Sequence, residues 1–336
     1  MNKCFISIVL PIYNESDNLS LFYSELCKAV VHLEDRYDFE MIMINDGSID
    51  NSWQKIRSLA QSDQRIKAIC LSRNFGHQVA LTVGYDIAAG QAIISMDTDL
   101  QHPPELIATL LDEWRKGTPI IYVRNSERVH SWLKKKLSDW FYIILDCIAS
   151  VKIPRNVQDF RLIDKKVLDV IKATKEKSRY LRGIVAWTGF NYVIVEVPYL
   201  KRMSGTSGYS WGKMWKLAFD GITGFSLFPL KIASYVGIFT IVTGTLMFFY
   251  ITIDALFFQV RYPLFKWLVT IIYIFIGIVF LLLWLIGEYI GRIYQELQGR
   301  PMYVVSDHLN LGKNEYHTLF RRSHATCNNC DISVGF

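Results

Sequence analysis

The feature that most constrains this 336-residue chain is a pair of long stretches without a charged residue, at 232–253 and 267–287. Each has 21 or 22 residues, and about 20 apolar residues suffice for a helix to cross the core of a bilayer. The link between them contains the helix breaker Pro263. The pattern predicts a transmembrane hairpin over 232–288. The alternative is a pair of buried core helices, which seldom run this long without a charge.

Basic residues around the hairpin predict its orientation. The link at 254–266 carries only Arg261 and Lys266, whereas the outer flanks carry Lys213, Lys216, Lys231, Arg292 and Arg300. Cytoplasmic flanks of membrane spans are enriched in Lys and Arg. We therefore expect a multi-pass protein whose N-terminal region and both chain termini lie in the cytoplasm.

The N-terminal region alternates strand-like and helix-like segments. Residues 16–31 have apolar positions at helical spacing. Apolar, β-branched runs typical of strands recur at 5–11, 39–45, 66–71 and 92–96. This alternation predicts an α/β domain with a mostly parallel sheet, which we assign to residues 1–208. The absence of G-x-G-x-x-G after the first strand and of G-x-x-x-x-G-K-[ST] argues against a dinucleotide fold and a P-loop ATPase.

Polar clusters follow three of the predicted strands, where ligands bind in sheets of this kind. They are 13–15, 46–48 and 97–99. In the last cluster Asp97 and Asp99, followed by Gln101, can direct oxygens at one Mg²⁺ or Mn²⁺ shared with substrate phosphates. The alternative is a solvated loop with incidental acids.

A net charge of only +6 gives no reason to expect a nucleic-acid partner, and 51% hydrophobic residues exclude a disordered chain.

A set of ordered motifs resembles those of family-2 glycosyltransferases with the GT-A fold. They are P-I-Y-N-E at 11–15, N-D-G-S at 45–48, R-N-F-G-H-Q at 73–78, M-D-T-D-L-Q-H-P-P-E at 96–105 and Q-D-F-R-L at 158–162. With G-T-S-G-Y at 205–209 and D-G-I-T-G-F-S at 220–226, the chain is similar to polyprenyl-phosphate glycosyltransferases over about residues 5–305. That group includes dolichol-phosphate mannose synthase and the bacterial undecaprenyl-phosphate glucosyltransferases of O-antigen modification. The resemblance implies a Rossmann-like GT-A catalytic domain.

The resemblance also implies roles for individual residues. Nucleotide-binding residues would be Pro11, Tyr13, Glu15, Asp46 and Asp97, and the metal and diphosphate would be faced by Asp97, Asp99 and Gln101. Asp159 would be the catalytic carboxylate, with Asp99 beside it in the reaction. The chain departs from the family at His102, where an acid is common, and in G-T-S-G-Y, where relatives often have G-E-S-K-Y.

The chemistry of the acceptor bears on the role of Asp159. A phosphate monoester has a second pKa near about 6 and is mostly dianionic at pH 7, so it is a nucleophile without a strong base. We expect Asp159 to orient the acceptor or to stabilise an oxocarbenium-like transition state at least as much as to remove a proton. A single displacement would invert the anomeric centre. The alternative for Asp159 is a structural salt bridge to Arg161.

Phosphate groups in the substrates also require cations. Arg124, Lys135 and Arg202 are the closest matches to the family's phosphate contacts, and Arg128 is a weaker candidate. The alternative is a solvated basic face. Two aromatic-rich helical stripes beside basic residues, 132–148 and 211–225, are typical of helices at a membrane surface. Packing against the sheet or against a partner subunit explains them equally well.

These observations predict a domain order and a reaction. We expect an amphipathic juxtamembrane helix at 209–231 and a cytoplasmic segment at 289–336, whose Cys327 and Cys330 lie in a loose tail and not in a zinc site. The expected reaction is inverting transfer of a hexose, from UDP-glucose in the first instance, to undecaprenyl phosphate at the cytoplasmic face of a bacterial inner membrane. The product would be a lipid-linked sugar for O-antigen modification. The family suggests a homo-oligomer such as a tetramer, and a separate flippase would act downstream.

Other donors, such as UDP-GlcNAc or UDP-aminoarabinose derivatives, stay open, as do three further functions. GDP-mannose could replace UDP-glucose, with a polyprenyl or dolichyl phosphate as acceptor. A processive polysaccharide synthase would need Q-x-x-R-W, which residues 158–162 miss by one residue, and more than two spans. A membrane scaffold that only binds nucleotide sugars would need neither the D-x-D pair nor Asp159.

Overall fold

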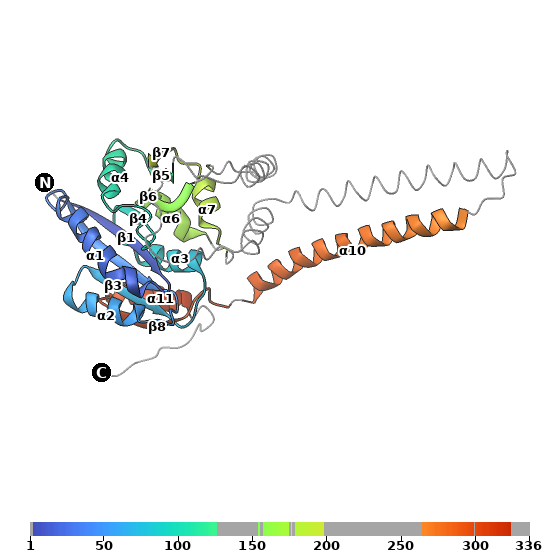
Figure 1. Ribbon diagram of the computed structural model, residues 1–336, viewed down its shortest axis with the longest axis horizontal. Coiled ribbons are helices and arrows are strands. Elements are labelled where there is room, and N and C mark those ends of the chain that lie inside the picture. Colours follow the sequence, from blue (N-terminus) through green and yellow to red (C-terminus); the bar gives the residue numbers. More distant parts are fainter. Residues whose placement is uncertain are drawn as a thin grey trace. The chain divides into compact units, whose positions relative to one another are not determined.

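The computed structural model describes residues 3–125, 154, 157–174, 176, 179–197, 264–298 and 300–323. The chain divides into two compact units. The first unit comprises residues 1–146, 151–214 and 299–336, and the second comprises 147–150 and 215–298. The first unit holds a sheet with its surrounding helices, and the second contributes one long helix (Figure 1).

The sheet has eight strands in the order β7-β5-β6-β4-β1-β2-β3-β8. In chain order they are β1 (Cys4–Ile12), β2 (Tyr37–Asn45), β3 (Ile66–Leu71), β4 (Ala92–Ser95), β5 (Ile120–Asn125), β6 (Val157–Asp164), β7 (Tyr192–Val197) and β8 (Val305–Leu309). β1 pairs in parallel with β2 and β4, β2 with β3, and β5 with β7. β6 runs antiparallel to β4 and β5, and β8 to β3. The predicted α/β domain with a mostly parallel sheet is confirmed.

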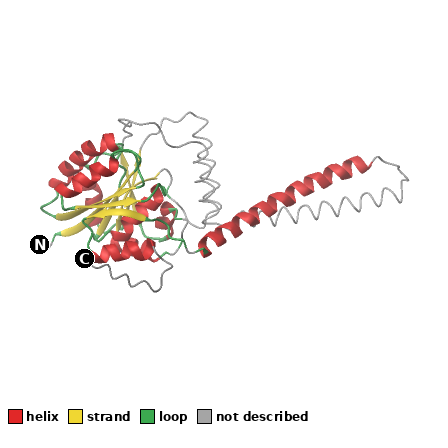
Figure 2. Ribbon diagram, turned by 90° about the horizontal axis from the view of Figure 1, so that it is seen from below, coloured by secondary structure: helices red, strands yellow, loops and turns green. Residues whose placement is uncertain are grey.

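Helices cover both faces of the sheet (Figure 2). They are α1 (Ser16–Val31), α2 (Ser52–Ser62), α3 (His77–Ile87), α4 (Leu106–Arg115), α6 (Lys165–Ala173), α7 (Leu181–Trp187) and α11 (Lys313–Ser323). α1 packs with α2 and α4, while α3 packs with α6 and α11. Strands enclosed on two faces read as continuous apolar runs, which is why residues 6–12 of β1 are all buried.

The parallel pairing brings three strand ends to one edge of the sheet. Ile12 of β1 lies opposite Asn45 of β2, and Val9 of β1 lies opposite Ser95 of β4. The polar clusters that follow these strands in the sequence therefore share that edge. β6 is antiparallel to β4, with Arg161 opposite Ser95, so its first residues reach the same edge. This arrangement brings Asp159 to the strand ends.

The segment after the long helix returns to the sheet, which the sequence did not predict. β8 pairs with β3, and α11, which follows β8, packs against α3. Lys67 of β3 forms ion pairs with Glu315 of α11 and with the buried Glu40 of β2. The fully buried Tyr303 donates a hydrogen bond from its hydroxyl to Asp86 of α3, at 3.3 Å. Residues 300–323 are thus part of the first unit, together with the sheet.

The long helix is α10 (Leu264–Leu297), which contains the second predicted span, 267–287. The first predicted span lies outside the described residues, as do the interfacial stripes at 132–148 and 211–225 and the juxtamembrane segment 209–231. Among the described residues, no helix has an apolar stretch long enough to cross a bilayer. The transmembrane hairpin stays a prediction.

The ion pairs of Lys67 lead to a test of how firmly the C-terminal segment is held. Removing one partner of a buried ion pair leaves an uncompensated charge, which costs about 3–5 kcal/mol. We expect Lys67→Met to lower the free energy of unfolding by about that amount, because Glu40 is left buried without its cation. Glu315→Gln should cost less, since Lys67 still neutralises Glu40.

Urea denaturation, monitored by tryptophan fluorescence, measures the change in the free energy of unfolding. The control is Lys3→Met, which removes an exposed pair with Asp38 and should cost less than about 1 kcal/mol. A Lys67→Met protein as stable as the Lys3→Met protein would show that the Lys67 ion pairs do not hold the C-terminal segment.

Candidate functional site

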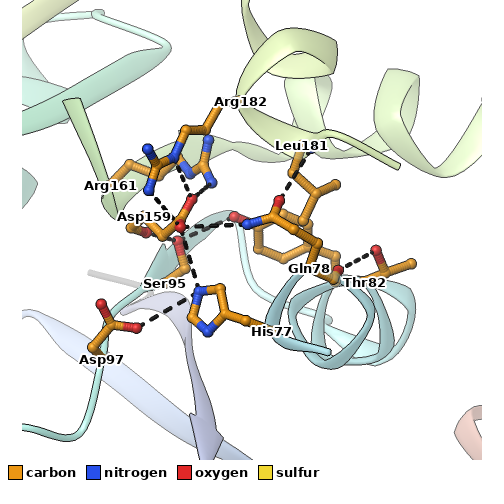
Figure 3. A network of polar contacts seen from close by, with 10 residues as sticks. His77, Gln78, Thr82, Ser95, Asp97, Asp159, Arg161, Leu181 and Arg182 are labelled. Atoms are coloured by element: carbon orange, nitrogen blue, oxygen red, sulfur yellow. Dashed lines mark hydrogen bonds and ion pairs between the residues drawn. The ribbon is translucent and has the colours of Figure 1, made fainter. Parts of the chain in front are cut away.

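A buried carboxylate, that of Asp159, lies at the centre of a cluster of charged side chains at the strand ends (Figure 3). Arg161 of the same strand donates from Nη2 to Oδ1 at 2.6 Å. Arg182 of α7 binds both oxygens, with Nη2 at 2.8 Å from Oδ2 and Nε at 3.1 Å from Oδ1. The salt bridge to Arg161, considered as the alternative from the sequence, is present. It arises because residues two apart on a strand point to the same face.

His77, the first residue of α3, joins Asp159 to the D-x-D segment. Its Nε2 lies 3.4 Å from Oδ2 of Asp159 and 3.7 Å from Oδ1 of Asp97. Both carboxylate oxygens contact one nitrogen, so they can be no more than about 7 Å apart. Gln78 also donates to Oδ2 of Asp159, at 3.4 Å, and accepts from the backbone N–H of Leu181 at 3.2 Å. The two acids thus lie on either side of the His77 imidazole.

Asp46 holds the loop from which His77 emerges. Its Oδ1 and Oδ2 accept from the backbone N–H groups of Phe75 and Gly76, at 2.8 and 2.9 Å. Gly47 has φ +63° and lies against this loop so closely that a Cβ would meet the Arg73 carbonyl carbon at 2.2 Å. Only glycine fits there. The N-D-G-S motif therefore sets the position of α3 as well as ending β2.

The predicted nucleotide-binding residues lie on β1 and the turn that follows it. Pro11 is buried in the strand opposite Ile44, whereas Tyr13 is exposed at the strand end. Oε2 of Glu15 accepts from Asn18 at 2.8 Å. The turn is fastened to the loop after β2, because the Asn14 N–H donates to Oγ of Ser48 at 3.0 Å.

The two acids of the D-x-D segment differ in their exposure to solvent. The side chain of Asp97 is 36% exposed, while Asp99 is buried and accepts from the Gln101 N–H at 3.1 Å. His102 is buried, and its ring packs edge-to-face against that of Phe160, with ring centroids 5.4 Å apart.

The pKa values follow from this geometry. Burial alone would raise the pKa of Asp159, but Arg182, His77 and Arg161 together hold it well below its ordinary value. Burial would lower the pKa of His77, but Asp97 and Asp159 outweigh it and raise that pKa to about 9. Burial raises the pKa of Asp97; His77 opposes the rise, while the charges of Asp159 and Asp99 add to it. Asp159 is therefore a fixed anion, and Asp97 carries a charge that further cations would stabilise.

Burial also raises the pKa of Asp46, and the hydrogen bonds from Phe75 and Gly76 reduce that rise. Among the residues that the structure describes, no three His, Cys, Asp or Glu side chains converge to hold a metal ion. The donor set nonetheless fits a divalent cation that is shared with a substrate. Asp97 and Asp99 supply hard oxygens, and a diphosphate would supply others.

Of the predicted phosphate-binding residues, the structure describes only Arg124. Arg124 of β5 forms an ion pair with Glu196, its neighbour on β7. Lys135, Arg202 and Arg128 lie outside the described residues. The structure instead reveals His77, Gln78 and Arg182 around Asp159. His77 and Gln78 end the R-N-F-G-H-Q motif and could have been noticed there, whereas Arg182 belongs to no motif that we identified.

Comparison with known proteins adds the relatives of this chain. The family model described as "Glycosyl transferase family 2" matches residues 7–172. An uncharacterized glycosyltransferase, YkcC of Bacillus subtilis, is 41% identical, covering 95% of this chain and 97% of that protein. A prophage-derived bactoprenol glucosyl transferase of Shigella flexneri is 38% identical, covering 89% and 97%. Among solved structures, glucosyl-3-phosphoglycerate synthase of Mycobacterium tuberculosis with Mn²⁺, UDP and phosphoglyceric acid has a TM-score of 0.39 at 16% identity, over 64% of this chain and 75% of that one.

The raised pKa of His77 predicts a dependence of stability on pH. A cationic His77 stabilises the fold fully below its ordinary pKa of 6.5, and this contribution is lost as the pH rises through about 9. We expect the melting temperature in metal-free buffer to fall between pH 7 and 9.5 in the native protein and less in His77→Gln. His317→Gln, an exposed histidine of α11, is the control. Equal slopes for the native protein and His77→Gln would contradict the bridging role of His77.

Proposed function

The chain belongs to glycosyltransferase family 2, and we propose that it transfers glucose from UDP-glucose to a polyprenyl phosphate, with inversion of the anomeric centre. The observation that carries this proposal is that Asp97 of the D-x-D pair and the fixed anion Asp159 both contact His77, which brings the two acids together at the strand ends. The choice of glucose and of a polyprenyl acceptor is supported by the bactoprenol glucosyl transferases, which are about as long as this chain.

The fixed charge of Asp159 suits this reaction. An oxygen of the acceptor phosphate forms a bond to C1 of the sugar, and the bond from C1 to the β-phosphate breaks with release of UDP. The acceptor oxygen is already anionic, so no proton has to be removed. Asp159, held ionised by Arg161 and Arg182, would stabilise the positive charge that develops on the sugar ring.

The D-x-D residues would hold a metal ion in this proposal. Asp97 and Asp99, with Gln101 beside them, would bind Mg²⁺ or Mn²⁺ together with the donor diphosphate. A bound divalent cation offsets the negative charge on the departing diphosphate. The like charges around Asp97 support this assignment, because a cation there relieves their repulsion.

The turn after β1 would bind the nucleotide. The exposed ring of Tyr13 offers a face for the base, and Pro11 and Glu15 lie on either side of it in the sequence. Asp46 would contribute through the loop that it fixes, since both of its oxygens already accept backbone hydrogen bonds. We therefore assign Asp46 a supporting role in the nucleotide site.

The membrane arrangement completes the proposal. The hairpin at 232–288 would anchor the enzyme in a bacterial inner membrane with the catalytic domain on the cytoplasmic side. Lys135 and Arg202 would contact phosphate at the bilayer surface. A homo-oligomer and a separate flippase remain part of the proposal. GDP-mannose is the second candidate donor, favoured only by the wider family.

The role of Asp159 is tested by a substitution that keeps its shape. We expect Asp159→Asn to reduce transfer by about 100–1,000-fold, the usual loss when a preorganised electrostatic group is removed. Asp97→Asn should be similarly impaired, and Asp169→Asn on the exposed side of α6 should be unaffected.

The assay offers radiolabelled UDP-glucose, UDP-GlcNAc or GDP-mannose to membranes supplied with undecaprenyl phosphate and counts label in the organic phase. Label in the organic phase from UDP-glucose alone supports the proposal. Label from GDP-mannose alone would show that GDP-mannose is the donor and not UDP-glucose. Near-native transfer by Asp159→Asn would refute the site.

Metal removal gives a separate test. We expect EDTA to abolish transfer and Mg²⁺ or Mn²⁺ to restore it, because without a cation the carboxylates of Asp97 and Asp99 would repel the diphosphate. Asp99→Asn should require more metal for half-maximal activity. Full transfer in the presence of chelator would rule out a metal at the D-x-D pair.

A further inference from the structure

Two arginines hold Asp159, and they differ in access. The guanidinium of Arg161 is entirely buried, and within the described residues its Nε and Nη1 have no hydrogen-bond partner. Because it is buried, Arg161 can bind Asp159 but cannot contact a ligand. The side chain of Arg182 is 26% exposed and grips the same carboxylate through Nε and Nη2. Of the two arginines, only Arg182 can be reached by a ligand.

The contacts of the site run in series. Asp97 contacts His77, His77 contacts Asp159, and Asp159 contacts Arg182 (Figure 3). The donor diphosphate is proposed to lie at the Asp97 end. In an inverting transfer the incoming group approaches the face of the sugar opposite the leaving group. The acceptor phosphate should therefore lie toward the other end, where Arg182 is the exposed cation on Asp159.

We propose that Arg182 binds the phosphate monoester of the acceptor while it holds Asp159. A guanidinium has five N–H donors in a planar fork, so one arginine can serve a carboxylate on one edge and a phosphate on another. Gln78 fixes the arrangement, because it joins the start of α7 to Asp159. The inference rests on the proposed function, and it adds a residue that the sequence motifs do not include.

The kinetic test varies acceptor and donor separately. A charge-assisted hydrogen bond to phosphate is worth about 10–100-fold in affinity, so Arg182→Gln should raise the KM for undecaprenyl phosphate by that factor. The KM for UDP-glucose should stay near the native value. Arg182→Lys should fall between, because a lysine keeps the charge and loses the fork. Arg57→Gln, which removes an exposed arginine 4.0 Å from Asp307, is the matched control.

Two kinetic outcomes would overturn the inference. An acceptor KM unchanged in Arg182→Gln, with only kcat reduced, would limit Arg182 to orienting Asp159. A rise in the donor KM equal to that in the acceptor KM would place Arg182 at the donor diphosphate.

A binding measurement separates this inference from the proposed function. Farnesyl phosphate is a short polyprenyl phosphate, and farnesol is the same chain without the phosphate. The native protein should melt at a higher temperature with farnesyl phosphate than with farnesol, and Arg182→Gln should lose that difference. If Arg182→Gln loses this difference in melting temperature but the native protein transfers no sugar from any nucleotide sugar, the proposed reaction is refuted and the phosphate site is supported. No difference in the native protein, or an equal one in Arg182→Gln, would refute the site.

Discussion

The burial of the Asp159 carboxylate is the constraint on which the rest of the site depends. Removing an ionised carboxylate from water costs several kcal/mol unless cations and hydrogen bonds compensate for it. Here Arg161 and Arg182 supply the cations, and His77 and Gln78 supply further donors. The result is an anion that stays charged and keeps its place. Such a group suits stabilisation of positive charge better than proton transfer.

The scaffold supports this cluster from several parts of the chain. Asp46 fixes the loop before α3, and Tyr303 contacts Asp86 farther along the same helix. α3 thus connects the cluster to residues that follow α10 in the sequence. β8 closes the sheet next to β3 with a short, half-exposed and polar strand, as is usual for an edge. The catalytic domain is therefore assembled from sequence on both sides of the predicted hairpin.

The sequence predicted what depends on local pattern and missed what depends on distant contacts. Enclosed strands such as β1 and β2 have continuous apolar runs, so the α/β sheet could be predicted. The pair of Asp159 and Arg161 follows from their spacing on one strand. Gln78 lies 81 residues before Asp159, and nothing local indicates that they meet. Arg182 is one arginine on a short helix, and β8 is too short and too polar to show an alternating pattern.

The central claim is that Asp159 remains an anion throughout the reaction and accepts no proton. The most direct measurement is the solvent deuterium isotope effect on a single turnover of sugar transfer to undecaprenyl phosphate. The account predicts a ratio of the rates in H₂O and D₂O of about 1, since no proton moves in the transition state. A ratio of about 2 or more on the chemical step, lost in Asp159→Asn, would identify Asp159 as a general base and contradict the account.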